Sequence, residues 1–162
     1  QAWATAFKPG QQYDFSCCVT LGISSNRYYV LDVFKQKVEY PELKRMVLSL
    51  ASKWNPSVIV IEDKASGQSL IQELRTQTRV AIHAFQIDKD KIARANLVTP
   101  ITEAKLCYLP EEGQWVADFV ESLASFPAAP HDDDVDAFVM AITYGSKKSA
   151  LFEFMRRQTE KA

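Results

Sequence analysis

The sequence predicts an α/β fold in which helices flank a central mixed sheet. Val58–Ile61 is a short, unbroken run of β-branched residues, which is typical of a strand covered on both faces. Three strand-like runs precede it with short connections, and an amphipathic helix separates them from it. A chain of 162 residues with 47% hydrophobic content is long enough to bury one such core as a single domain.

The first three strands are expected at Ala2–Phe7, Asp14–Leu21 and Tyr28–Phe34. Lys8-Pro9-Gly10 predicts a turn after the first strand, and residues 22–27 connect the second to the third. Three successive strands with short connections indicate an antiparallel meander.

The helix before the central strand is the clearest local pattern. Pro41 stands at a first helical position, and Asn55-Pro56 ends the helix. We expect Leu43, Val47 and Leu50 to pack on the sheet, because apolar residues recur at helical spacing. The full stripe is Leu43, Met46, Val47, Leu50, Ala51 and Trp54.

After the central strand, a helix is expected over Ser66–Arg75, with Ser66 as its N-cap, and a fifth strand over Val80–Ile87. Asp88–Val98 is charged and weakly periodic, and Pro100 separates it from Ile101–Ala104. The remaining expected elements are a short extended piece at Lys105–Leu109, a helical face from Trp115 to Leu123 and a helix carrying Val135, Phe138, Val139 and Ile142.

Three strands followed by helix, strand, helix, strand and helix are the element order of the ribonuclease H-like fold, here with a five-stranded sheet. The predicted domain covers residues 1–146, and residues 147–162 form a charged tail that is helical or frayed. The chain opens directly in a strand-like segment without an initiator methionine, so we expect it to be a piece of a longer protein.

The composition of the chain argues against several classes of protein. A formal net charge of -1 places any DNA contact on local basic clusters, and no apolar run approaches the ~18 residues of a membrane span. No signal peptide is visible, and the three cysteines lack zinc-ligand spacing, so reduced thiols in a cytoplasmic protein are expected.

Two acids, Glu62 and Asp63, end the central strand. Carboxylates at the carboxyl end of such a strand lie in the crevice where open α/β sheets place their ligands, although a solvated strand end explains them equally well. Neighbouring residues point to opposite sides of a strand, so Glu62 is the better candidate of the two.

A second group of acids follows His131 at the start of a predicted helix. Asp132, Asp133, Asp134 and Asp136 exceed the one or two acids that capping requires, and like charges at helical spacing repel. Carboxylate oxygens are the ligands of Mg²⁺ and Mn²⁺, so a metal site is the stronger interpretation and capping the weaker.

Five segments together resemble the C-terminal nuclease domain of the large terminase subunit of tailed bacteriophages and prophages, over residues 1–144. They are QAWATAFK, YDFSCC, EYPELKR, VIVIEDKASGQSLIQEL and HDDDVDAF. The resemblance implies a ribonuclease H-like fold and endonuclease activity that cuts concatemeric viral DNA during genome packaging, by two-metal phosphodiester hydrolysis with Mg²⁺ or Mn²⁺.

The chain departs from this family at its first strand. The family motif reads W-D-T-A, whereas this chain has Trp3-Ala4-Thr5-Ala6, so Ala4 stands where a metal-bridging aspartate is expected. The alanine is either an engineered replacement or a natural loss. In both cases metal binding should be weakened to one ion or less, and turnover should be severely reduced.

The resemblance also assigns roles to other residues. Glu62 and Asp133 correspond to the catalytic metal ligands beside position 4, with Asp132 and Asp136 as nearby ligands or their supports. His131 is a candidate metal ligand or proton shuttle, or simply a loop histidine. The candidates for DNA phosphate contacts are Lys91, Arg94, Lys64, Arg75 and Lys105.

The partners implied are double-stranded viral DNA, an ATPase domain upstream in the same protein, the portal and the small terminase subunit, in the cytoplasm of a bacterial host. The chain itself lacks the G-x-x-x-x-G-K-[ST] phosphate loop of such an ATPase. Two alternatives stay open: another ribonuclease H-like nuclease, such as a resolvase or transposase core, and a non-catalytic docking or DNA-guiding domain of a packaging motor.

Overall fold

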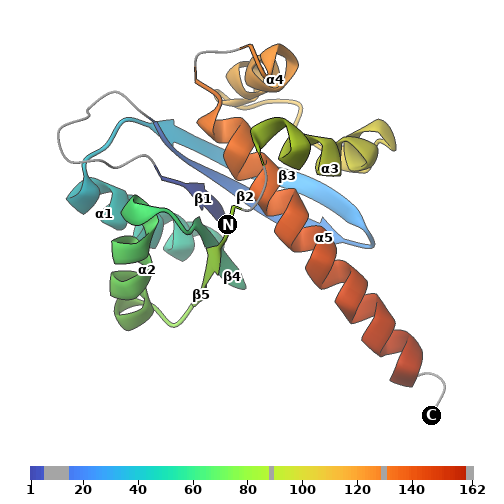
Figure 1. Ribbon diagram of the computed structural model, residues 1–162, viewed down its shortest axis with the longest axis horizontal. Coiled ribbons are helices and arrows are strands. Elements are labelled where there is room, and N and C mark those ends of the chain that lie inside the picture. The colour runs from blue at the N-terminus through green and yellow to red at the C-terminus, as the bar shows by residue number, and fades with distance from the viewer. Residues whose placement is uncertain (6–14, 88–89, 129–130, 160–162) are drawn as a thin grey trace.

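The computed structural model describes residues 1–5, 15–87, 90–128 and 131–159 (Figure 1). A six-stranded sheet runs in the order β5-β4-β1-β2-β3-β6. The strands are β1 Ala2–Ala4, β2 Ser16–Ser24, β3 Arg27–Gln36, β4 Val58–Glu62, β5 Ala81–Phe85 and β6 Cys107–Tyr108. The helices are α1 Tyr40–Trp54, α2 Ala65–Gln77, α3 Lys91–Glu103, α4 Val116–Ser125 and α5 Asp133–Thr159.

The predicted ribonuclease H-like architecture, with an antiparallel meander and added parallel strands, is confirmed. β2 is antiparallel to β1 and β3, whereas β1–β4, β4–β5 and β3–β6 are parallel pairs. The carboxyl ends of β1, β3, β4 and β5 therefore meet at one edge of the sheet. Five strands were expected and six are present, because the short extended piece before Pro110 pairs with the start of β3 as β6.

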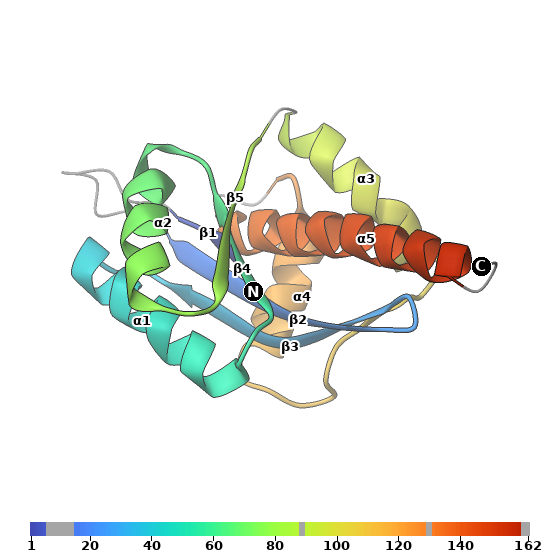
Figure 2. The same cartoon turned by 90° about the horizontal axis from the view of Figure 1, so that it is seen from below.

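Helices cover both faces of the sheet, α1 and α2 on one and α3 and α5 on the other (Figure 2). Alternation along the strands explains the division. Trp3, Cys18 and Ile61 pack with α1 and α2, whereas Ala4 and Cys17 pack with α5. Side chains of β1 at even positions therefore face α5, and this face carries the candidate site.

The predicted helix before the central strand is confirmed as α1, with one correction to its buried face. Leu43 and Val47 are fully buried, but Leu50 is half-buried and Ala51 takes the expected core position. Asn55 ends the helix in the left-handed conformation.

Leu43→Ala is expected to lower the free energy of unfolding by ~2–5 kcal/mol, because it removes a fully buried side chain from the core under α1. Leu97→Ala is the matched control: Leu97 is 51% exposed on α3, and its loss should cost less than ~0.5 kcal/mol. Urea denaturation of both variants checks the pair, and equal losses would contradict this assignment of the core.

The segment after β5 differs most from expectation. Lys91–Glu103 is one helix, α3, that contains Pro100 rather than ending before it. The Asp90 carboxylate caps the helix by accepting from the Ala93 N–H at 2.9 Å. Pro100 is tolerated because it and Asn96, whose carbonyl loses its helical donor, are both exposed to water.

Other boundaries shift. Residues 6–14, including the predicted turn at Lys8-Pro9-Gly10 and the start of the second strand, lie outside the described residues. Ser66 is not an N-cap, because α2 begins at Ala65 with Lys64 at the cap position. α5 continues to Thr159, so the described part of the tail is helical. None of the three cysteines is disulfide-bonded, and among the described helices none has the length and apolarity to cross a membrane.

Candidate metal-dependent nuclease site

Glu62 and Ala4 lie side by side at the carboxyl edge of the sheet. β1 and β4 are parallel with Trp3 opposite Ile61, so the next pair along is Ala4 and Glu62. Neighbouring strands are ~4.8 Å apart, and alternation directs both side chains to the α5 face. Both residues are buried, at 5% and 4% exposure. An acidic side chain at position 4 would therefore face Glu62 across one strand spacing.

A tight turn after β4 holds Glu62 in place. The Gly67 N–H donates to the Lys64 carbonyl at 2.8 Å, and the first turn of α2 passes directly over the strand end. A Cβ on Gly67 would lie 2.0 Å from the Glu62 carbonyl oxygen, so only glycine fits there. This close approach explains the glycine in the EDKASGQ segment.

Gly67→Ala is expected to destabilise the fold by ~1–3 kcal/mol, because the new methyl group forces the backbone of Glu62 or α2 to move. Gly22→Ala is the control, since its nearest new neighbour is a Leu31 side-chain carbon at 3.4 Å, an ordinary contact. Thermal melts of the two variants should differ clearly. A Gly67→Ala melt that matches the unaltered chain would show that the turn can relax without cost.

The Glu62 carboxylate is buried beside a single basic group. Lys64 Nζ lies 2.7 Å from Glu62 Oε1, but the pair lacks hydrogen-bond alignment, and Oε1 accepts no hydrogen bond from any described residue. Lys64 is itself 58% exposed, so it can leave the acid easily. Asp63 points away as expected and accepts from Gln68 Nε2 at 3.2 Å.

The acid-rich start of α5 comes to the same place. Asp133 is the first helical residue, and the Asp132 carbonyl accepts from the Asp136 N–H at 3.0 Å. The pKa of the Cys17 thiol is raised far above its usual range, first by burial and then by the negative charges of Asp133 and Asp134. Cys17 is the register partner of both Ala4 and Lys35, and Lys35 binds Asp134, so the start of α5 lies over this part of the sheet.

Asp132 and Asp136 are held by basic residues of α3. Lys91 binds both, with its Nζ 2.9 Å from Asp136 Oδ2, and Arg94 lies 3.2 Å from Asp136 Oδ1. Burial alone would lower the pKa of Lys91, but its hydrogen bonds to Asp132 and Asp136 outweigh burial and raise it. Lys91 and Arg94, predicted as phosphate contacts, thus neutralise the acids of the helix start.

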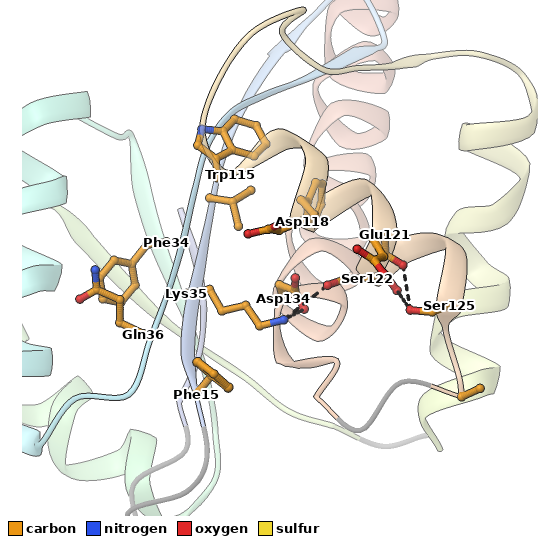
Figure 3. Close-up of a pocket in the computed structure, with 13 residues that line it drawn as sticks. Phe15, Phe34, Lys35, Gln36, Trp115, Asp118, Glu121, Ser122, Ser125 and Asp134 are labelled. Atoms are coloured by element: carbon orange, nitrogen blue, oxygen red, sulfur yellow. Dashed lines mark hydrogen bonds and ion pairs between the residues drawn. The ribbon is translucent and has the colours of Figure 1, made fainter.

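Asp134 is the most buried acid among the ion pairs of this region, and sequence reasoning missed its partner. Lys35 Nζ lies 3.0 Å from Asp134 Oδ1, with the Ser122 hydroxyl and the His131 carbonyl each at 3.4 Å (Figure 3). The Asp134 side chain is 2% exposed and that of Lys35 is 26% exposed. The pair ties β3, α4 and α5 together. The alternation of side chains along β3 could have predicted a partner for Lys35, because Lys35 lies on the same face of the strand as buried Val33.

A cavity of about 810 Å³ opens beside this pair, between the end of β3 and α4. Its lining includes Phe15, Lys35, Trp115, Phe119 and Asp134, but neither Glu62 nor Asp133 (Figure 3). The cavity therefore adjoins the acidic site and gives the Lys35 side chain access to water.

Two of the predicted phosphate contacts lie elsewhere. Lys105 precedes β6, which pairs with the start of β3, so it is roughly 25 Å along the strand from Lys35. Arg75 is in the last turn of α2 and donates to the Ile82 carbonyl near the start of β5. Both are at the sheet edge opposite Glu62. His131 is exposed, and its ring packs edge-on against Phe15 at 5.2 Å.

The residues present do not form a complete metal site. Among the side chains that the structure describes, no three or more from His, Cys, Asp and Glu gather closely enough to hold an ion. Glu62 Oε1, a buried carboxylate oxygen whose neighbour at 2.7 Å is the exposed ammonium of Lys64, is the kind of oxygen that binds a divalent cation. Position 4, beside Glu62 on the next strand, carries only the methyl group of alanine.

The comparisons with known proteins agree with the fold. The family model described as "Terminase RNaseH-like domain" matches residues 1–144. A solved structure of the human cytomegalovirus terminase nuclease domain, soaked with Mn and bound to an inhibitor, is similar at a TM-score of 0.59 with 11% sequence identity. The match covers 85% of this chain and 79% of that chain. No curated protein sequence matches.

Proposed function

Since this chain belongs to the family of terminase RNaseH-like domains, we propose that it is the nuclease domain of a phage genome-packaging terminase, inactive here because Ala4 replaces a metal-binding aspartate. Its substrate is concatemeric duplex DNA, and its reaction is hydrolysis of a phosphodiester bond. The fold and the family match confirm the terminase assignment made from the sequence. The DNA substrate, the reaction and the loss of activity through Ala4 are what we propose.

One observation supports the proposal above the others. Ala4 and Glu62 are adjacent on parallel strands, on the face and edge where Asp133 also stands. An aspartate at position 4 would bring three carboxylates from three separate elements to one point. Helix capping would explain only the acids at the start of α5. It would not require position 4 of β1 and Glu62 of β4 to lie beside them, because neither strand is part of that helix.

The proposed cofactor is Mg²⁺ or Mn²⁺, in two ions once position 4 is acidic. Glu62 and Asp133 would hold the metal, with Asp132 and Asp136 beside them. Bound there, the ions would activate water and stabilise the leaving oxygen. The Mn in the similar cytomegalovirus structure supports this choice. With Ala4 the ligand set is incomplete, so we derive no reaction step for the chain as it stands.

The basic side chains around the site have a role of their own in this proposal. Lys64 beside Glu62, and Lys91 beside Asp132 and Asp136, balance carboxylates that would otherwise repel one another. A divalent cation would take over this balance and release the ammonium groups toward the DNA.

The proposed assembly follows from the family: an ATPase domain upstream in the same protein, the portal and the small terminase subunit, working on viral DNA in the bacterial cytoplasm. A second candidate function is a non-catalytic DNA-guiding domain, which the absence of an acid at position 4 favours. Cleavage of plasmid DNA by the Ala4→Asp variant, beside the unaltered chain, separates the two.

A further inference from the structure

We propose that the DNA entering this site passes over the carboxyl end of β3, where its phosphates bind Lys37, whose ammonium rests on the Phe15 ring. The inference depends on the proposed nuclease function and adds to it the face on which the substrate lies. The sequence suggested a different set of contacts, centred on α3.

The register of the sheet places Lys37 at the correct edge. β1 and β3 run parallel on either side of β2, with Ala4 opposite Cys17 and Cys17 opposite Lys35. Lys35 is therefore two strand spacings, about 10 Å, from Ala4, and Lys37 is about 7 Å further along. The Cα of Lys37 is then roughly 12 Å from that of Ala4, which corresponds to three to four base pairs along the DNA axis at about 3.4 Å each.

The contacts of Lys37 place it on the same face as the acids. Its Nζ lies 4.8 Å from the centre of the Phe15 ring, and Lys35 Nζ lies 5.5 Å from the same ring. His131, next to the acids of α5, packs on this ring edge-on. Phe15 thus holds two ammonium groups within the range of a cation–π contact, beside the start of α5.

Charge balance distinguishes Lys37 from the other basic residues near the site. Lys64, Lys91 and Arg94 each pair with a carboxylate of the site. Lys35 pairs with Asp134. Within the described residues, Lys37 forms no ion pair, and its side chain is exposed. A phosphate that binds Lys37 therefore displaces no carboxylate of the described residues.

A lysine of this kind recognises the phosphate backbone rather than the bases. It supplies a point charge that neutralises one phosphate and releases about one counterion, so it changes affinity in a salt-dependent and sequence-independent way.

Binding measurements test the inference without requiring catalysis. The affinity of the chain for a short fluorescent DNA duplex is measured by anisotropy between 50 and 200 mM salt. For Lys37→Gln, the slope of log K against log salt should become shallower by ~0.9, and Lys37→Arg should restore it. Lys148→Gln is the matched control: Lys148 is exposed on α5 and lines a second cavity with Asn55 and Pro56, at the opposite edge of the sheet.

The possible outcomes distinguish failure of the inference from failure of the proposed function. If the unaltered chain binds DNA and Lys37→Gln keeps its slope, the inference is wrong and the proposed function stands. If Lys148→Gln changes the slope as much as Lys37→Gln does, binding is a property of net charge alone, and the inference is again wrong. If the unaltered chain binds no DNA under any of these conditions, both the inference and the proposed function fail.

Discussion

The Ala4→Asp variant is expected to cut duplex DNA in the presence of Mn²⁺ at least ~100-fold faster than the unaltered chain. Loss of a group that merely orients a metal ligand costs 10–100-fold, and loss of a ligand itself should cost no less. Ala4 faces Glu62 across one strand spacing, and Asp133 begins the helix that packs on this face, so we expect the new carboxylate to complete a set of three.

The same variant should be less stable than the unaltered chain when metal is absent. Position 4 is buried, and a third carboxylate there adds repulsion and desolvation. Mn²⁺ should then raise the melting temperature of Ala4→Asp far more than that of the unaltered chain, because a ligand that binds only the folded state stabilises it.

Three controls make the cleavage result decisive. Ala4→Asn has the size of aspartate without its charge, and it should stay inactive. Glu62→Gln in the Ala4→Asp background should abolish the gain, and EDTA should abolish it as well. Equal metal-dependent cleavage by the unaltered chain and Ala4→Asp would place the active site elsewhere, and an inactive but metal-stabilised Ala4→Asp would favour the DNA-guiding function.

Lys35→Met is expected to lower the free energy of unfolding by ~3–5 kcal/mol, more than Asp134→Asn does. The asymmetry follows from exposure. Without Lys35, the Asp134 side chain, which is 2% exposed, is left buried without its basic partner. Without the charge of Asp134, Lys35 can turn its ammonium into the adjoining cavity of about 810 Å³ and regain water.

Urea denaturation of the two single variants and the double variant measures this prediction. The double variant should recover part of the loss of Lys35→Met, because it leaves no uncompensated charge. Lys44→Met is the surface control: Lys44 pairs with Glu73 at 2.8 Å, Glu73 is 40% exposed, and the change should cost less than ~1 kcal/mol. An Asp134→Asn loss equal to or above that of Lys35→Met would contradict the argument.

Several elements could be predicted from the sequence because their causes are local. The stripe in Tyr40–Trp54 and the apolar run Val58–Ile61 formed the predicted helix and strand. The excess of acids after His131 correctly marked a helix start. Pro100 was wrongly expected to separate two segments, because exposure to solvent allows it inside a helix. The extended piece around Cys107–Tyr108 was expected, but its pairing with the distant strand β3, which makes it a sixth strand, was not.

The sequence by itself determined the fold class, the terminase resemblance and the alanine at position 4. Only the tertiary structure decided which charged side chains form ion pairs with one another. Asp134 pairs with Lys35, which is 99 residues away in the sequence, and Lys91 pairs with Asp132, which is 41 residues away. The order of strands in the sheet sets those partners, and no local pattern encodes that order. Three of the basic residues expected on DNA, Lys64, Lys91 and Arg94, therefore pair with acids, whereas Lys37, which the sequence pattern did not single out, is the proposed phosphate contact.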